Sequence, residues 1–450
     1  MRHKTIYLWA FLVLSPGFLN TGSMAQKAWT LEECIQYAQD QNINIKRQDL
    51  LIQSSKSNYQ TAHAGRLPRV NAWASHNLSS GKTINIEDYT YINRQYQDGN
   101  LGIRGDIPLF EGFGVLNSIR QQKFAFQAAI QESEKLRNSI SIQVTSAFLQ
   151  LLFAKELLQV AKEQHNVSLE QVESTRIFVE GGRMANSTLL EMQAQAAQDM
   201  LIKTQAESTL ETSRLQLVHL MNLSDITSFR ISHPQELVFT NSPLPDPVQL
   251  FQIAARDLPR IKGAELRVKS SEYGLAATKG LLYPSIGLDG VYYSRYSEMG
   301  VNPLDPVGVY TKGQQLSDNA YKQVSLSINF PILNQFQTKN RIAQAKITAL
   351  DAKLALDAEK ITLRQEIQQS YTDARNAWSK YLASEDAVNS IQQSFDFTKE
   401  KFDAGLATSV EYSVSTSQLI KTRSQLLQAK YEYILRLKIL DFYQGNPITL

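Results

Sequence analysis

Two long stretches of this chain, 115–180 and 332–404, contain neither glycine nor proline. These two residues are the ones that most reliably end a helix. At ~1.5 Å per residue, a helix over either stretch is roughly 100 Å long, whereas an average globular helix has only ~11–12 residues. Each stretch follows a strand-like segment that contains a proline, and each ends at a glycine, Gly181 or Gly405. The sequence therefore predicts two rod-like helices joined to a part built of strands.

The N-terminal segment has the three parts of a secretory signal peptide. Arg2 and Lys4 provide a basic start, residues 6–14 an apolar core, and the small residues before Gln26 a cleavage site. The apolar core is too short to span a membrane, so we expect residues 1–25 to be removed without leaving a helical anchor. Their removal lowers the formal net charge from +3 to +1. A charge so close to zero gives no reason to expect nucleic acid as a partner.

The residues that carry catalysis or bind metals are sparse. Cys34 is the only cysteine, so the chain has no internal disulfide and no cysteine-based metal cluster. The six histidines are isolated, and the motifs of zinc proteases, serine hydrolases and phosphate-binding loops are absent. We therefore expect no enzyme, no metal and no cofactor. Export without disulfide or anchor points to the periplasm or the outer membrane.

The chain contains an internal repeat. Ala38, Ile45 and Pro68 recur 216 positions later as Ala254, Ile261 and Pro284, and Pro108, Phe113 and Gly182 recur 223 positions later as Pro331, Phe336 and Gly405. The seven extra residues of the second half therefore lie between Pro284 and Pro331. A proline-rich connector, 224–247, separates the halves.

The repeat predicts the same order of elements in each half. The first half, 26–240, is expected to contain strands at about 67–78 and 99–109, a long helix 113–180 and a returning helix 184–223. The second half, 241–450, is expected to contain strands at about 284–296 and 321–332, a long helix 335–404 and a returning helix 407–443.

The expected strands alternate apolar and polar residues. Val324, Leu326 and Ile328, for example, are separated by Ser325 and Ser327. This period of two fits a half-buried strand of a soluble sheet or a strand of a membrane barrel, and by itself it favours the soluble sheet. The expected polar loops at about 79–98 and 297–320 favour the barrel. So do aromatic residues near the strand ends, which we interpret as an interfacial girdle: Trp73, Phe110, Phe113, Tyr283, Tyr292, Tyr293, Tyr296, Tyr321, Phe330 and Phe336.

Four strands cannot close a membrane barrel, because the smallest barrels have ~8 strands and lipid does not tolerate open sheet edges. Two chains would supply eight strands with a filled interior, and three would supply twelve with room for a channel.

The long helices carry stripes with 3–4 spacing, which are typical of a coiled-coil seam. Val144, Ala147, Leu151, Ala154, Leu158 and Ala161 form the first stripe, and Ala374, Trp378, Tyr381, Val388, Phe395 and Phe402 the second. An ordinary two-helix hairpin packed on itself also explains one stripe.

Several short segments carry a family resemblance. They are PLFEGF at 108–113 with its partner PILNQF at 331–336, the glycine turns GGRMAN at 181–186 and GLATS at 405–409, and the closing LRLKILDFYQGNP at 435–447. In their order and spacing the chain resembles the TolC-like outer-membrane efflux family over nearly its whole mature length. The ending looks like that of members from the Bacteroides group.

The resemblance implies an α+β fold that is mainly α. Four membrane β-strands per chain would give a 12-stranded barrel in a homotrimer within outer-membrane lipid, and the long helices would form an α-helical barrel in the periplasm. It also implies a passive exit duct that works with a periplasmic adaptor protein and an inner-membrane transporter.

The resemblance places functional residues at the helix turns. Gly182, Arg183, Gly405, Leu406 and Ala407 match tips that meet the adaptor, although Gly182-Arg183 departs from the usual small apolar pattern. Glu411 matches an acidic position that rings the periplasmic aperture, and Glu191 in the first repeat is a candidate to supplement it. The next acidic position of the family is Val414 here, so a second ring is absent.

Alternation along the strands places three further candidates. Arg104, Asp106 and Asp289 occupy polar positions, so we expect their side chains to face the barrel lumen.

The rival interpretation is a soluble periplasmic helical-hairpin scaffold or adaptor-like protein, in which the four strands form a small sandwich.

Overall fold

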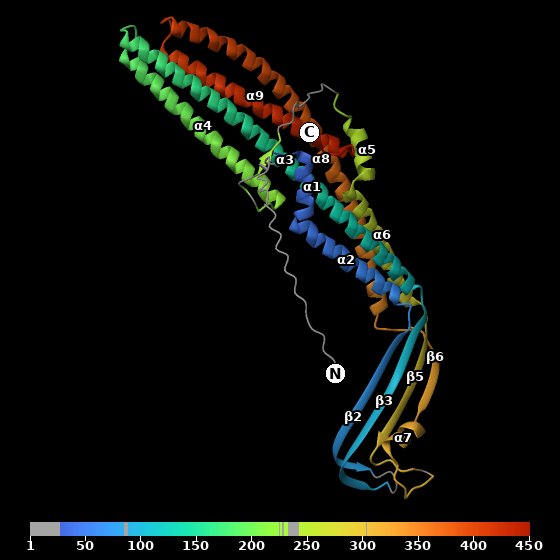
Figure 1. Cartoon of the computed structure of the whole chain (residues 1–450). Coiled ribbons are helices and arrows are strands. Elements are labelled where there is room, and N and C mark those ends of the chain that lie inside the picture. Colours follow the sequence, from blue (N-terminus) through green and yellow to red (C-terminus); the bar gives the residue numbers. More distant parts are fainter. Residues whose placement is uncertain (1–27, 85–88, 225, 227–228, 233–242, 303) are drawn as a thin grey trace, which may run out of the picture.

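The computed structural model describes residues 28–84, 89–224, 226, 229–232, 243–302 and 304–450. The predicted signal peptide, 1–25, lies outside these residues, as does most of the predicted connector between the repeats. Figure 1 shows an elongated molecule whose helices occupy one part and whose four long strands extend from the other end.

The elements follow one another in the same order in the two halves. The first half contains β1 (Ala28–Trp29), α1 (Leu31–Gln41), α2 (Ile43–Ala64), β2 (Arg69–Ile84), β3 (Tyr91–Glu111), α3 (Gly114–Glu180), α4 (Asn186–Met221) and β4 (Arg230–Ile231). The second half contains α5 (Pro247–Asp257), α6 (Pro259–Lys279), β5 (Ser285–Ser297), α7 (Lys312–Asp318), β6 (Tyr321–Asn329), α8 (Gln337–Asp403) and α9 (Ser409–Tyr443). The short helix α7 and the loop around it have no counterpart in the first half.

The two long helices are equal in length and begin in the same way. Both α3 and α8 have 67 residues. The residues before them, Phe113 and Phe336, are paired in the repeat and both adopt the left-handed conformation, with φ of 62° and 59°. A bulky residue rarely takes this conformation, so the shared strain marks a fixed turn from strand into helix.

Each long helix packs against its returning helix, α3 against α4 and α8 against α9 (Figure 1). The middle of α3 is the centre of the largest core, where Val144, Phe148 and Leu152 meet Leu217 of α4 and residues of α1 and α9. Helix α3 also contains a window long and apolar enough to cross a membrane, but 56% of that window is buried inside the fold. Its apolar character is therefore explained by this core.

The four long strands form one antiparallel sheet in the order β2-β3-β5-β6. Cross-strand pairing fixes which side chains share a face. One face, here called the polar face, carries rows such as Asn71, Arg104, Val291 and Gln323. The opposite face, here called the apolar face, carries rows such as Leu288 and Leu326 beside Ile107. Helix α7 contacts this face at the end of β5, through Ser294, and no other described helix packs over it.

Two expectations about the strands are wrong. The first hairpin is longer than expected, because β2 continues to Ile84 and β3 begins at Tyr91, so most of the expected loop 79–98 is strand. Outside lipid both faces of a hairpin can be polar, so the alternation ends while backbone pairing continues.

The expected girdle of aromatic residues is also only partly right. Tyr292 and Tyr296 belong to the apolar face, but Trp73, Tyr293 and Tyr321 lie in one row on the polar face. Gly102 occupies the β3 position of that row, where a Cβ would come within 2.5 Å of the Trp73 ring and 2.7 Å of Tyr293. The glycine therefore lets the indole lie across β3 toward Tyr293.

Candidate functional sites at the two ends of the molecule

The glycine turns at the far end of the long helices are built alike. Gly182 and Gly405 adopt left-handed φ values of 69° and 75°. The residue after each glycine donates a backbone hydrogen bond to the carbonyl of the residue five positions earlier: Arg183 N–H to Phe178 at 2.8 Å, and Leu406 N–H to Lys401 at 2.7 Å. This is the Schellman ending of a helix, which requires a left-handed residue at the glycine position. Figure 1 shows both turns at the same end of the molecule, away from the strands.

The side chains at these turns differ between the repeats. The guanidinium of Arg183 lies 4.7 Å from the centre of the Phe178 ring, a cation–π contact within the first turn. Leu406 is almost fully exposed, whereas Ala407 is partly buried against the core beneath it. The second turn therefore presents an apolar side chain, and the first turn a cationic one.

Glu411 lies at the start of α9, where its carboxylate forms a capping box with Thr408. It accepts hydrogen bonds from the Thr408 backbone N–H at 2.8 Å and from the Thr408 hydroxyl at 3.1 Å. These two bonds lower the pKa of Glu411 below its usual value of 4.5, and the bond from the backbone N–H has the larger effect. The carboxylate is thus charged at neutral pH, and its contribution to the helix start is lost only as the pH falls through the lowered pKa.

Glu191 lies near the start of the other returning helix, α4, and connects it to α9. Its carboxylate accepts a hydrogen bond from the hydroxyl of Ser409, which is itself buried. The structure therefore brings the two candidate acidic residues to the same end of the molecule, but each is bonded to the first turn of α9.

The structure contains a cluster of buried polar side chains near this end of the molecule. The stripe of apolar residues along α3 does not predict it. Asp199 of α4 is 1% exposed, and its carboxylate accepts hydrogen bonds from the Ser168 hydroxyl, from Gln164 Nε2 at 3.3 Å and from Gln195 Nε2 at 3.0 Å. The sequence did contain a signal for this. The 3–4 spacing of the α3 seam continues past Ala161, but with polar residues that are all buried: Gln164, Ser168, Gln171 and Thr175.

The second helical hairpin, formed by α8 and α9, has an aromatic core near the same end of the molecule. Phe402 of α8 stacks on Tyr412 of α9 with ring centres 5.0 Å apart, and Phe395 lies 5.8 Å from the same tyrosine. Met192 of α4 completes the core, so this cluster joins the two hairpins. Burial raises the pKa of the Tyr412 hydroxyl, which stays protonated at physiological pH.

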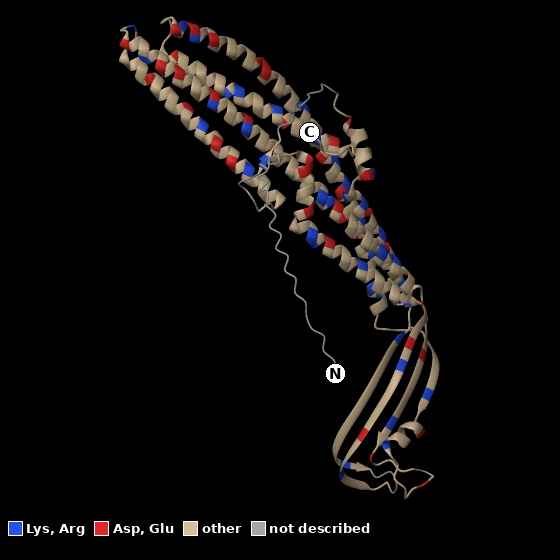
Figure 2. Ribbon diagram, viewed as in Figure 1, with Lys and Arg blue, Asp and Glu red and all other residues tan. Residues whose placement is uncertain are grey.

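At the opposite end, the polar face of the sheet carries the remaining candidates. Arg104 Nη2 lies 3.2 Å from Asp289 Oδ1. Asp106 is directly opposite Asp289 in the pairing of β3 with β5. All three candidates therefore share the polar face, as the alternation predicts. Figure 2 shows that such charges are sparse on the strands and common on the helices.

The part of the chain that the structure describes contains no cluster of three or more His, Cys, Asp or Glu residues able to hold a metal ion. Among the charged candidates, Arg104 pairs with Asp289, Glu411 is part of a capping box, and Glu191 accepts a hydrogen bond from Ser409.

Comparisons with known proteins identify the family. The sequence matches the family model described as "Outer membrane efflux protein" over residues 34–223 and 250–446. The outer membrane efflux protein BepC of Brucella suis is 22% identical over 432 residues, which cover 94% of this chain and 87% of BepC. The outer membrane protein TolC of Escherichia coli is 21% identical over 366 residues, 77% of this chain and 71% of TolC.

Solved structures show the same fold. The outer membrane protein VceC from Vibrio cholerae superposes with a TM-score of 0.77 at 16% identity, over 93% of this chain and 96% of VceC. The open state of the MtrE outer membrane channel of Neisseria gonorrhoeae gives a TM-score of 0.76 at 16% identity, over 99% of this chain and 98% of MtrE. The predicted resemblance and the predicted mainly α fold are thereby confirmed. Because the family model covers both repeats, this chain belongs to the outer membrane efflux proteins, a family of transport channels of the outer membrane and not of enzymes.

Proposed function

We propose that three copies of this chain form a passive exit duct, with a 12-stranded barrel in the outer membrane and a helical tube in the periplasm. The duct receives its cargo from an inner-membrane transporter through a periplasmic adaptor protein, as part of a tripartite efflux or type I secretion system.

The sheet is the observation that carries this proposal. Its apolar face is open, with Val324, Leu326 and Ile328 all more than half exposed, and no other described strand pairs with the outer edges of β2 and β6. Exposed apolar surface of this extent marks an interaction site, and free edges cannot face lipid. Lipid against the apolar face, and strands of other copies against the edges, satisfy both requirements.

The number of copies follows from the need for a lumen. Two copies supply eight strands, and side chains fill the interior of an eight-stranded barrel. Three copies supply twelve, the smallest closed assembly of this sheet that leaves a channel. The polar face, with Arg104, Asp106 and Asp289, then lines the lumen.

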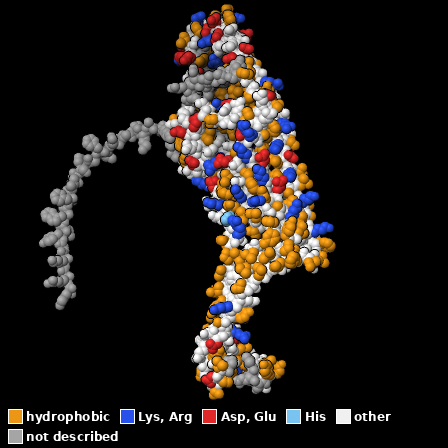
Figure 3. Space-filling view, turned by 90° about the vertical axis from the view of Figure 1, so that its right-hand side faces the viewer, with side chains coloured by type: hydrophobic (Ala, Val, Ile, Leu, Met, Phe, Trp, Pro, Cys, Tyr) orange, Lys and Arg blue, Asp and Glu red, His pale blue; other side chains and the backbone are white. Residues whose placement is uncertain are grey.

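The long helices support the same assembly. Ile347, Leu350, Leu354 and Ile361 of α8 are all exposed, although their spacing of three, four and seven is that of a coiled-coil seam. Figure 3 shows hydrophobic side chains gathered on the helical part beside the strands. We propose that a neighbouring copy covers this stripe, which closes the helical tube.

The turns at the far end are then the periplasmic tips. We propose that Gly182, Arg183, Gly405, Leu406 and Ala407 meet the adaptor there. Leu406 provides an exposed apolar contact, and Arg183 a cationic one. Because their turns end helices of equal length, both reach the adaptor at one level.

The mass of the detergent-extracted protein tests the proposal. Native mass spectrometry with the detergent removed should show three chains, each close to 50.8 kDa less the signal peptide. The same membranes washed with carbonate should retain the protein. A single chain, or release by carbonate, would instead favour the soluble helical-hairpin scaffold, in which the apolar face of the sheet would need a cover that no described part of the chain supplies.

Substitution of Glu411 by glutamine tests the proposed aperture. Glutamine keeps an oxygen that can accept both capping hydrogen bonds, so α9 should begin at the same residue. The change removes one negative charge per chain. Carboxylates around a narrow opening attract cations, so block of single channels by divalent cations should weaken.

Glu191→Gln is the matched variant of the first repeat, and a weaker effect there would show that Glu411 is the main acidic residue of the opening. Identical divalent block in the wild type and Glu411→Gln would remove Glu411 from the aperture.

A further inference from the structure

The loop between β5 and β6 is a folded structure rather than a simple connection. Strand β6 begins at Tyr321, which pairs with Tyr293, so the last residues of β5 extend beyond it. Helix α7 occupies the place next to this extension. The Ser294 hydroxyl donates to the Leu316 carbonyl at 2.7 Å, and the Asn319 side-chain amide donates to the Arg295 carbonyl at 3.0 Å.

The side chain of Gln315 makes the central hydrogen bonds that attach the loop to β5. It is only 3% exposed; its Oε1 accepts the Ser297 N–H at 2.8 Å, and its Nε2 donates to the Tyr310 carbonyl at 2.9 Å. A buried side chain that bonds to both the strand and the loop fixes the loop against the sheet.

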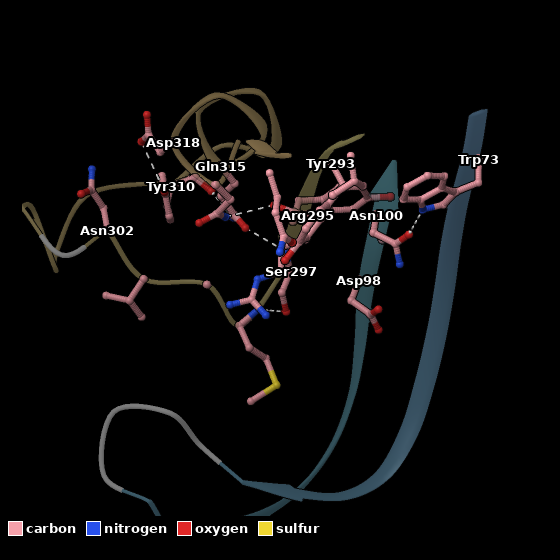
Figure 4. Close-up of a pocket in the computed structure, with 18 of the residues that line it drawn as sticks. Trp73, Asp98, Asn100, Tyr293, Arg295, Ser297, Asn302, Tyr310, Gln315 and Asp318 are labelled. Carbon is pink, nitrogen blue, oxygen red and sulfur yellow. Dashed lines mark hydrogen bonds between the residues drawn. The ribbon is translucent and has the colours of Figure 1, made fainter. Parts of the chain in front are cut away.

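The loop lies over the polar face. Between the loop and the sheet lies a half-open pocket of about 1270 Å³. The sheet residues Trp73, Arg104, Tyr293 and Arg295 line one side of it, and loop residues such as Leu304 and Tyr310 line the other. Most of the sheet residues that line it carry their side chains on the polar face. Figure 4 shows the labelled residues Trp73 and Asn100 of the sheet on one side of this space and Asn302 and Tyr310 of the loop on the other.

The loop carries three apolar side chains that no described part of the chain covers. Leu304, Val307 and Val309 are 95%, 97% and 87% exposed. A turn holds them in place, since Asn302 Oδ1 accepts the Leu304 N–H at 3.0 Å and Asp305 Oδ1 accepts the Gly308 N–H at 3.1 Å. Three adjacent apolar side chains with this exposure indicate a contact with another molecule.

The position of the loop decides what that molecule is. In a closed barrel the polar face is the inside, so lipid cannot reach a loop that lies over it. The equivalent loops of the other copies lie over the same face of the barrel, related by the symmetry axis of the assembly, so they are the surfaces that we expect these side chains to meet.

We infer that the three β5–β6 loops meet on the axis at the outer mouth of the duct, where Leu304, Val307 and Val309 form a hydrophobic constriction. This inference rests on the proposed trimeric duct. A ring of apolar side chains stops water and ions by dewetting, without any charge. The duct then has a barrier at its outer end, separate from the opening at the helix tips.

Cross-linking tests the contact directly. The native thiol, Cys34, is buried, and burial raises its pKa to about 12, so it reacts slowly and the wild type serves as background. Val307→Cys in the purified assembly should give covalent dimers in more than half of the chains with a short bifunctional maleimide. Val324→Cys, at a position that is also exposed (77%, against 97% for Val307) but lies on the apolar face of β6, should give almost none.

Access from outside the cell tests the barrier. Gln323→Cys places a thiol on the polar face, beneath the loop. A maleimide that cannot cross membranes reaches it only through the outer mouth. Replacing Leu304, Val307 and Val309 together by serine should speed this labelling by about tenfold or more, because a polar opening stays wet.

The outcomes separate the two proposals. A three-chain assembly in which Val307→Cys does not cross-link, or in which the serine substitutions leave the labelling rate unchanged, overturns the constriction and leaves the duct intact. A single-chain mass overturns both.

Discussion

Replacing Leu326 by arginine should abolish assembly in the outer membrane. Leu326 lies on the apolar face of β6, pairs with Leu288 and is 61% exposed. An arginine near the middle of the bilayer costs about 2–4 kcal/mol. Each of the three chains pays this cost in the same barrel, so the effect on the assembly is larger still. The measurement is the amount of protein that stays with outer membranes after a carbonate wash.

The adjacent Ser327 provides the matched control. Its side chain belongs to the polar face, and its hydroxyl lies 3.3 Å from the Gly287 carbonyl. Ser327→Arg places the same charge one residue along the same strand, but toward water. We expect this variant to assemble in the membrane. Normal assembly of Leu326→Arg together with failure of Ser327→Arg would mean that the two faces have been assigned the wrong way round.

Replacing Phe402 by alanine should loosen the tip of the second hairpin. Phe402 is 1% exposed and stacks on Tyr412, so its loss leaves a cavity between α8 and α9. Truncation of a buried phenylalanine costs about 3–5 kcal/mol. Hydrogen exchange measures the local opening, and the amides around Tyr412 should exchange roughly 10²–10³ times faster, since each factor of ten corresponds to about 1.4 kcal/mol.

Phe397 is the matched control for this change. It lies on the same helix, five residues before Phe402, but it is 67% exposed. Phe397→Ala should change the local free energy of opening by no more than about 0.5 kcal/mol. Similar exchange in the two variants would show that the aromatic core does not hold the hairpin together.

Much of the fold could be predicted because its strongest signals are long and repeated. The stretches without glycine or proline, each ended by a glycine turn, indicate helices about as long as α3 and α8. Pairing of Phe113 with Phe336 in the repeat agrees with a left-handed conformation that both adopt. The alternation in 324–328 indicates the two faces of the sheet, because a strand has only two sides.

Other features depend on contacts that no local pattern contains. Trp73 belongs to the polar face because of its register with Gly102 and Tyr293, and that register is set by the whole sheet. The loop over the polar face is held by a few side-chain hydrogen bonds of Ser294, Gln315 and Asn319. In the sequence these residues look like those of any polar loop. Likewise, Glu411 has the position of an aperture residue and also that of a capping residue, and only the structure shows its bonds to Thr408.

The polar seam of α3 gives the helical part a gradient of stiffness. Near its middle the seam is apolar, with Phe148 and Leu152 in the largest core, whereas toward the tip it passes through Gln164, Ser168 and Gln171. Hydrogen bonds between helices contribute less net free energy than apolar packing, because water can replace them once the helices part. The first helical hairpin, α3 with α4, is therefore held most firmly near its middle, whereas near its free end the apolar contacts come from Val172 and Met192, which pack on the aromatic core of the second hairpin. We therefore expect the largest displacement of the first helical hairpin at its free end, where the adaptor is proposed to bind.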